Sequence, residues 1–269
     1  MTGLQGWMIW FTNLNECNHC LGRRAPRLVF VSWVDAIMLW DSKIIAVATS
    51  KGGAGKSTSV CCLALYFASQ GLKVGILDCD PNGTLTRWHA KGGALSQLPI
   101  ISEVDEKQII SSIASLSAAN DIVLVDCPGF NSQVMVYALG VANLVLVPVM
   151  TDEANLFEAI RTKMLVDWAS TATKRPIEVR AFLSRIKSSN LVSHSRGELE
   201  KAGVKLLRAS VADRIAFQEA TYFGSSPLID DPSSGAARDV VALAAEVGAI
   251  LENGKHSWPH APAIHDLAS

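Results

Sequence analysis

Several features are scarce in this 269-residue sequence, and each scarcity excludes a class of protein. Charged residues make up only 18% and the net charge is −1, so attraction to nucleic acid would require a local basic patch. No apolar run is long enough to span a bilayer. A single pair, Cys17 and Cys20, has C-x-x-C spacing, which without a second pair is weak support for a metal site. The 49% hydrophobic content indicates a globular protein with a sizeable core.

The other four cysteines stand inside apolar stretches, where a free cysteine behaves as a small hydrophobic residue. They are Cys61, Cys62, Cys79 and Cys127. We therefore expect buried thiols in a protein that works in the reducing cytoplasm.

The two ends of the chain differ in composition from the middle. Residues 1–42 hold four of the seven tryptophans but no lasting periodicity, and a signal peptide fits poorly because no small-residue cleavage site follows the apolar run. This segment is either a poorly ordered extension or the product of a start placed too early, and we favour a natural start near Met38. Residues 254–269, with three histidines and two prolines, are expected to be a disordered tail.

A glycine-rich loop at residues 50–58, Ser-Lys-Gly-Gly-Ala-Gly-Lys-Ser-Thr, follows the apolar run 44–48 and precedes the apolar helical stretch 60–68. Glycines let backbone N–H groups surround a phosphate, Lys56 adds a positive charge, and the Ser57 hydroxyl can bind Mg²⁺. The following helix N-terminus strengthens the attraction for anions. The residues expected to bind nucleotide are Gly52, Gly53, Ala54, Gly55, Lys56, Ser57 and Thr58.

Carboxylates follow two further apolar runs. The run from residue 73 ends in Asp78 and Asp80, and residues 121–126 end in Asp126. Ligands bind at the carboxyl ends of strands in open α/β sheets, so we expect these groups beside the glycine-rich loop. By itself, Asp80 before Pro81 could equally be a turn residue.

Strands and helices alternate along the chain, which predicts one α/β domain over 43–253: a doubly wound, mostly parallel sheet with helices on both faces. The expected strands are 44–48, 73–80, 97–102, 121–126, 143–152 and 176–185. An expected helix at 153–169 carries Trp168, which we predict to pack against the sheet.

Three motifs give the chain a family resemblance over about residues 43–253. Lys51 followed by Gly-Gly-x-Gly-Lys-Ser resembles the deviant Walker A of the ParA/MinD superfamily of P-loop ATPases. The Asp78-x-Asp80-Pro-Asn stretch resembles the family's Asp-x-Asp-Pro-Gln, with Asn82 replacing Gln, and residues 121–129 resemble a Walker B. Small plasmid-type ParA partition proteins look most similar.

The resemblance implies a role for each matching residue. Lys51 would reach across a nucleotide-sandwich dimer, and Asp80 would position or activate the attacking water. Asp78 would lie near the Mg²⁺ site and Asp126 would hold Mg²⁺ through water. The catalytic set would then be Lys51, Lys56 and Asp80, and the metal set Ser57, Asp78 and Asp126.

The segment 174–214 contains ten lysines and arginines against four acidic residues, a local charge of +6. Concentrated positive charge is the footprint of a surface that binds phosphate backbones, although i,i+4 pairs on a solvated helix are an alternative. Residues 212–220 also resemble the half of ParA proteins that contacts DNA. The predicted DNA contacts are Arg185, Lys187 and Arg214.

The resemblance thus implies a cytoplasmic, nucleoid-associated ATPase using ATP and Mg²⁺, a homodimer with ATP bound, acting in plasmid or chromosome partition with a ParB-like centromere-binding protein. Alternatives are a related ATPase that positions another cargo, such as a conjugation or relaxosome helper, and a metabolic ligase or iron–sulfur carrier of the superfamily. The C-terminal residues lack a basic amphipathic helix, so the membrane anchor of MinD-type proteins is not expected.

Overall fold

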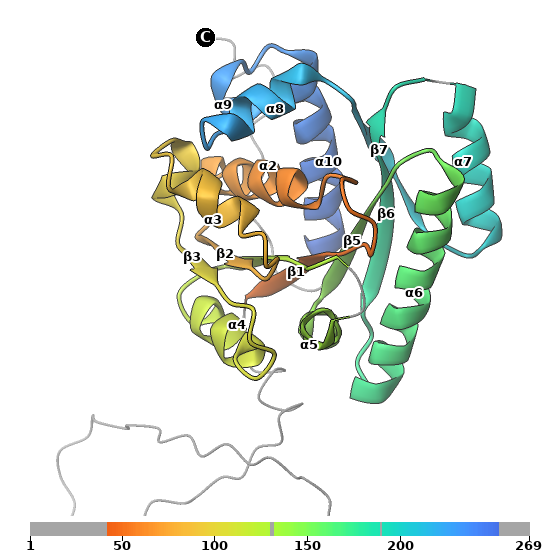
Figure 1. Cartoon of the computed structure of the whole chain (residues 1–269), viewed down its shortest axis with the longest axis horizontal. Coiled ribbons are helices and arrows are strands. Elements are labelled where there is room, and N and C mark those ends of the chain that lie inside the picture. The colour runs from red at the N-terminus through yellow and green to blue at the C-terminus, as the bar shows by residue number, and fades with distance from the viewer. Residues whose placement is uncertain (1–41, 130–131, 189, 253–269) are drawn as a thin grey trace, which may run out of the picture. The chain divides into compact units, whose positions relative to one another are not determined.

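The computed structural model describes residues 42–129, 132–188 and 190–252 (Figure 1). Residues 1–41, the start near Met38, the Cys17/Cys20 pair and the tail 254–269 lie outside the described residues. The predicted domain limits therefore stay predictions.

A seven-stranded parallel sheet forms the centre of the described chain, in the order β3-β2-β4-β1-β5-β6-β7. The strands are β1 (Lys43–Val47), β2 (Val74–Asp78), β3 (Ile100–Ser102), β4 (Ile122–Asp126), β5 (Leu144–Val149), β6 (Glu178–Ile186) and β7 (Leu206–Ala212). β2, β4 and β5 are buried along their whole length, as expected of parallel strands covered on both faces. The predicted fold class is confirmed.

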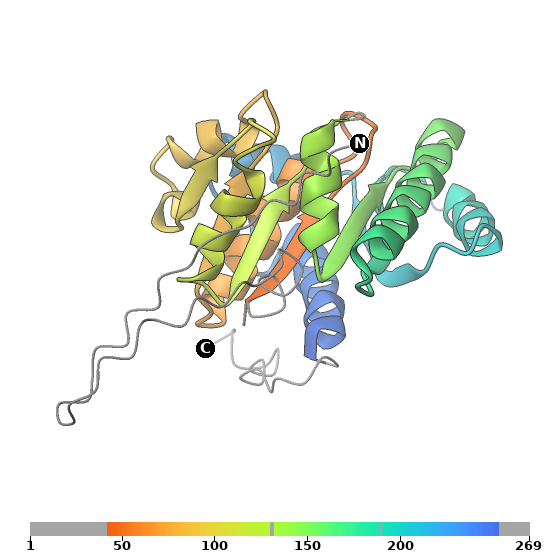
Figure 2. The ribbon, with the colours of Figure 1, turned by 90° about the horizontal axis from the view of Figure 1, so that it is seen from below.

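Helices cover both faces of the sheet (Figures 1 and 2). On one face α2 (Lys56–Ser69) and α10 (Gly235–Glu252) pack on the strands and on each other; on the other lie α4 (Ile109–Ser117), α5 (Gln133–Val141), α6 (Glu153–Thr173) and α7 (Asn190–Lys201). Shorter elements surround α2: α3 (Thr84–His89), η1 (Ala94–Gln97), α8 (Ile215–Tyr222) and α9 (Pro227–Asp230). None of the described helices is both long enough and apolar enough to cross a membrane.

Strand register brings the predicted site residues together. In β2 and β4, Asp78 pairs with Asp126, and in β1 and β4, Val47 pairs with Asp126. The loop after β1 therefore leaves the sheet beside both carboxylates, as the sequence predicts for the carboxyl ends of neighbouring strands.

Two sequence expectations need correction. Trp168 is 60% exposed, because the buried face of α6 consists of smaller residues such as Ala159, Val166 and Ala169. The sequence interpretation also missed β7, an edge strand whose residues are mostly half-buried and lack the continuous apolar run of a central strand.

The four cysteines of the described segments are free and buried, as predicted. Burial raises the pKa of the Cys62 thiol to about 12 and also raises the pKa values of Cys61, Cys79 and Cys127. Since the thiolate is the reactive form, these cysteines belong to the core.

Candidate active site

The glycine-rich loop connects β1 to α2 and depends on left-handed backbone at two glycines. Gly53 has φ 79° and Gly55, which precedes the first residue of α2, has φ 96°. A Cβ on Gly55 would lie 3.0 Å from the Ser184 Oγ at the end of β6. Glycine is therefore needed at position 55 both for its conformation and for the close approach of β6.

Lys56 is buried, with 6% of its surface exposed. The loop after β4 lies against the same group, because a Cβ built on Gly129 would be 3.8 Å from Lys56 Nζ and 3.5 Å from the Ser50 carbonyl oxygen. A buried ammonium at a helix N-terminus, enclosed by two loops, forms a concentrated anion-binding site.

Asp126 is fully buried at the end of β4. The Ser57 Oγ donates a 2.6 Å hydrogen bond to its Oδ2, whereas its Oδ1 is buried without a hydrogen-bond partner among the described residues. Burial raises the pKa of this carboxyl to about 7; the Ser57 hydrogen bond and Lys56 oppose the rise, while Asp78 and Asp80 add to it.

This arrangement suits a divalent cation. A buried carboxylate oxygen without a partner, next to a serine hydroxyl, provides hard oxygen ligands, and a cation would offset the desolvation of Asp126. Among the described residues no three His, Cys, Asp or Glu side chains cluster as a metal site. Mg²⁺ binding here would thus rely on nucleotide phosphates and water for its remaining ligands.

Asp78 and Asp80 hold the loop between β2 and α3. The Thr86 backbone N–H and Oγ1 donate to Asp78 Oδ2 at 2.9 and 2.8 Å, and the Asp80 N–H donates to Asp78 Oδ1 at 3.3 Å. The Asn82 N–H and Nδ2 donate to Asp80 Oδ1 at 2.9 and 2.8 Å. Asn82, which replaces the family's glutamine, therefore orients Asp80 itself.

Lys51 lies at the surface of the loop. The residue is exposed, and in the described segments its side chain has no hydrogen bond or ion pair; only its backbone N–H reaches Thr49 Oγ1, at 3.5 Å. Ser50 is held differently, because its hydroxyl donates to the Glu158 carboxylate of α6. The first lysine of the motif is thus available to a group outside this chain.

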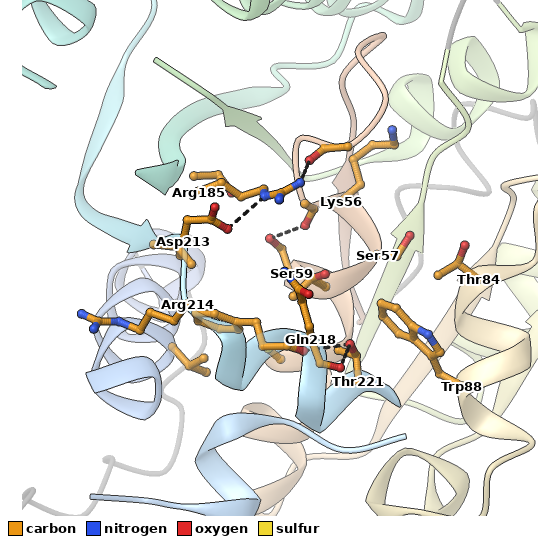
Figure 3. A pocket seen from close by; sticks show the side chains of 18 of the residues that line it. Lys56, Ser57, Ser59, Thr84, Trp88, Arg185, Asp213, Arg214, Gln218 and Thr221 are labelled. Carbon is orange, nitrogen blue, oxygen red and sulfur yellow. Dashed lines mark hydrogen bonds and ion pairs between the residues drawn. The ribbon is translucent and has the colours of Figure 1, made fainter. Parts of the chain in front are cut away.

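A cavity of about 550 Å³ opens beside the loop (Figure 3). One wall comes from α3, with Thr84 and Trp88, and another from α8, with Phe217, Gln218 and Thr221. The volume is in the range of small-molecule and cofactor pockets. From the sequence, residues 212–220 are associated with DNA contacts, and nothing in their pattern indicates that α8 forms a wall of this cavity.

Arg185 lies at this cavity. Its Nη1 donates to the Gly53 carbonyl oxygen at 3.0 Å and its Nε to Asp213 at 3.3 Å (Figure 3). Arg185 has φ 52°, a left-handed conformation that bends the chain at the end of β6. The structure therefore places this predicted DNA contact in the wall beside the glycine-rich loop.

Lys187 and Arg214 also lie at the carboxyl ends of strands, directly after β6 and just after β7. Lys187 pairs with Asp213 at 3.6 Å with 72% of its side chain exposed, and Arg214 pairs with Asp239 at 3.1 Å with 44% exposed. In Figure 3 the Arg214 guanidinium points away from Lys56 and Ser57.

The basic residues of the segment 174–214 lie at opposite ends of the strands. Arg180 and Lys205 pair with Glu178 at the amino ends of β6 and β7, whereas Arg185, Lys187 and Arg214 lie at the carboxyl ends. The ten basic residues therefore do not form one surface. Only those at the carboxyl ends of the strands adjoin the candidate site.

Comparison with known proteins identifies the family of the chain. The family described as the CobQ/CobB/MinD/ParA nucleotide binding domain matches residues 45–228. The "Protein ParA" of Rhizobium radiobacter is 30% identical over 187 residues, which are 68% of this chain and 84% of that protein. The "Maintenance of carboxysome distribution protein A" of Halothiobacillus neapolitanus is 25% identical over 186 residues, covering 68% of this chain and 85% of that one.

Solved structures show the same fold. The septum site-determining protein MinD of Pyrococcus horikoshii, complexed with Mg-ADP, has a TM-score of 0.64 and 20% identity. The alignment covers 80% of this chain and all of the MinD chain, 100%.

Proposed function

Since the chain belongs to the CobQ/CobB/MinD/ParA family of nucleotide-binding domains, we propose that it is a Mg²⁺-dependent ATPase of DNA partition. It forms a homodimer on ATP and binds DNA without sequence specificity. A ParB-like partner stimulates hydrolysis, and the protein works in the cytoplasm on the nucleoid.

One observation carries this proposal. In a loop similar to that of ParA, Lys51 is exposed and its side chain has no partner among the described residues. A lysine with no partner among residues 42–129, 132–188 and 190–252 suits the cross-subunit role that the family resemblance implies. The buried Lys56 and the paired Ser57 and Asp126 supply the rest of the phosphate and cation site.

The proposed chemistry is phosphoryl transfer to water, which depends on positioning and charge neutralisation. Backbone N–H groups of residues 52–57 bind the phosphates, and Lys56 neutralises their charge. Ser57 and Asp126 would hold Mg²⁺, which withdraws charge from the phosphate oxygens. Asp80, oriented by Asn82, positions the attacking water. Asp78 helps to orient Asp80, because its Oδ1 accepts a hydrogen bond from the Asp80 backbone N–H.

Lys51 gives a direct test of dimerisation. With ATP and Mg²⁺, light scattering should show a doubled mass for the Asp80→Ala variant, in which hydrolysis is blocked, and only monomer for Asp80→Ala combined with Lys51→Ala. The matched control is Lys107→Ala, which removes another exposed lysine, in the turn before α4. Dimers that persist without Lys51 would refute the cross-subunit role.

DNA binding gives the second test, because contacts to phosphates release counterions. The ATP-bound protein should shift duplexes of unrelated sequence equally, and Lys187→Ala should lower the log–log salt slope by about 0.9 per subunit. Lys205→Ala is the matched control, since Lys205 lies at the amino end of β7, away from the candidate site. If the ATP-bound protein does not bind duplex DNA even at low salt, the partition proposal fails. ATPase activity can still be measured separately.

A second candidate function keeps the ATPase and changes its cargo. The similarity to the carboxysome distribution protein favours it, with nearly the same coverage as the ParA match. The neighbouring gene distinguishes the two, because a partition locus should encode a small DNA-binding protein whose addition raises the ATPase rate.

A further inference from the structure

Ser50 connects the phosphate loop to α6, a helix from a distant part of the chain. Its hydroxyl donates to the Oε2 of Glu158, which belongs to α6. The P-loop pattern G-x-x-x-x-G-K has a glycine at this offset before Gly55 and Lys56, and a glycine could not make this bond. The serine therefore gives the loop a side-chain anchor at its first residue.

Ser50 also lies against the second loop of the site. A Cβ built on Gly129, in the loop after β4, would be 3.5 Å from the Ser50 carbonyl oxygen and 3.8 Å from Lys56 Nζ. A shift of residue 50 would therefore change the surroundings of the buried ammonium. Further along the loop, Arg185 Nη1 donates to the Gly53 carbonyl oxygen at 3.0 Å. The loop is thus held at two points, by α6 and by β6.

The Glu158 carboxylate is itself fixed in place. The side chain is only 13% exposed, and its Oε1 pairs with Arg161 Nη1 at 3.2 Å while its Oε2 accepts from Ser50. A carboxylate beside an anion-binding loop would repel phosphates, and the guanidinium offsets that charge. Electrostatic attraction for phosphate is therefore not the reason for an acidic residue here. The geometry favours a different role, that of a fixed acceptor for the Ser50 hydroxyl.

We propose that Glu158 is a positioning residue for nucleotide binding, acting through Ser50. A phosphate loop binds tightly when its N–H groups already point at the phosphates, because ordering the loop on binding costs conformational entropy. That cost is lower when residue 50 is already fixed in the folded chain. The inference rests on the nucleotide binding of the proposed function, and it does not depend on dimerisation or on DNA.

Calorimetric titration of the full chain with Mg-ADP tests the anchor. Ser50→Ala should bind Mg-ADP about tenfold more weakly than the parent, because a hydrogen bond to a charged group is lost. Ser50→Thr keeps the hydroxyl and should restore the affinity. Ser69→Ala is the matched control, since it removes an exposed hydroxyl at the other end of α2. Without nucleotide, the amides of residues 50–55 should exchange hydrogen faster in Ser50→Ala than in the parent.

Variants of Glu158 separate the anchor from the charge. Glu158→Ala should weaken Mg-ADP binding as much as Ser50→Ala does, and the double variant should be no weaker than either single one. Glu158→Gln should stay close to the parent, because its amide oxygen can still accept from Ser50. If the carboxylate acted through its charge alone, both Glu158 variants would bind the anionic nucleotide more tightly. Asp167→Ala, which removes a more exposed carboxylate of the same helix, should change nothing.

The proposal is overturned if Glu158→Ala binds Mg-ADP as tightly as the parent or more tightly, if the losses in the two single variants add up in the double variant, or if Ser50→Thr binds as weakly as Ser50→Ala. A parent that binds no Mg-ADP would overturn the nucleotide-binding function and this role with it. A parent that binds Mg-ADP but does not shift DNA when ATP is bound would overturn DNA partition alone.

Discussion

An Asp126→Asn variant should melt at a higher temperature than the parent when nucleotide is absent, and should hydrolyse ATP at least about a hundredfold more slowly, about 2.7 kcal/mol in the barrier. The two effects share one cause. The carboxylate is fully buried, with one oxygen bonded to Ser57 and the other without a partner in the described structure. It costs stability until a cation compensates it, and the amide removes both the cost and the ligand.

The pH dependence of the effect has a definite sign. The pKa of Asp126 is raised from 3.8 to about 7, chiefly by burial, so between these pH values the folded state keeps a proton that the unfolded state has released. The free energy of unfolding of the parent therefore falls as pH rises through this window. At pH 8 the variant should be more stable than the parent by on the order of 1–3 kcal/mol, and near pH 4 the difference should vanish.

Calorimetry at pH 4, 6 and 8 without nucleotide would measure the gap between the two melting temperatures. Asp167→Asn is the matched control, because it neutralises an exposed carboxylate of α6 and should show no widening gap. A gap that stays constant with pH would contradict a buried, destabilising charge at Asp126.

The parts of the site that the sequence predicts are those encoded within one short stretch. The phosphate loop needs glycines at fixed offsets directly before the start of a helix. That pattern lies within the nine consecutive residues 50–58. Asp78 and Asp126 are each the last residue of an apolar strand, so parallel pairing alone places them side by side. No knowledge of side-chain packing is required for either inference.

The parts that it does not predict come from distant segments whose packing decides their neighbours. Arg185 contacts Gly53, 132 residues away, so its charge alone could not distinguish a pocket wall from a DNA surface. Trp168 lies outside because Ala159 and Ala169 already fill the space between α6 and the sheet. Size and hydrophobicity predict burial on average, but the helix rotation that fits the sheet decides it here.

The largest stability loss is expected for Gly93→Ala, at a contact that joins the two walls of the cavity. A Cβ on Gly93 would lie 2.1 Å from the Phe223 carbonyl oxygen and 2.6 Å from that of Gly224. Gly224 in turn sits against the Trp88 carbonyl oxygen of α3, 2.4 Å from its own would-be Cβ, and accepts a 2.8 Å hydrogen bond from the Leu95 N–H.

Because backbone atoms cannot move aside as a flexible side chain can, one added methyl must separate the α3–η1 segment from the loop after α8. We expect a loss of about 3 kcal/mol or more, or roughly 6–12 °C in melting temperature, with weaker nucleotide binding since Trp88 and Thr221 line opposite walls.

The neighbouring glycine separates contact from conformation as the cause. Gly93 has φ −77°, which alanine adopts freely, so its cost is steric alone. Gly92 has φ 78° and no atom within 4 Å of a Cβ, so Gly92→Ala should cost only about 1 kcal/mol of backbone strain. Thermal melts and nucleotide titrations of the two variants should rank Gly93→Ala as far more damaging. The reverse order would mean that α3 and α8 are not held together by this glycine contact, and that the cavity walls are positioned independently.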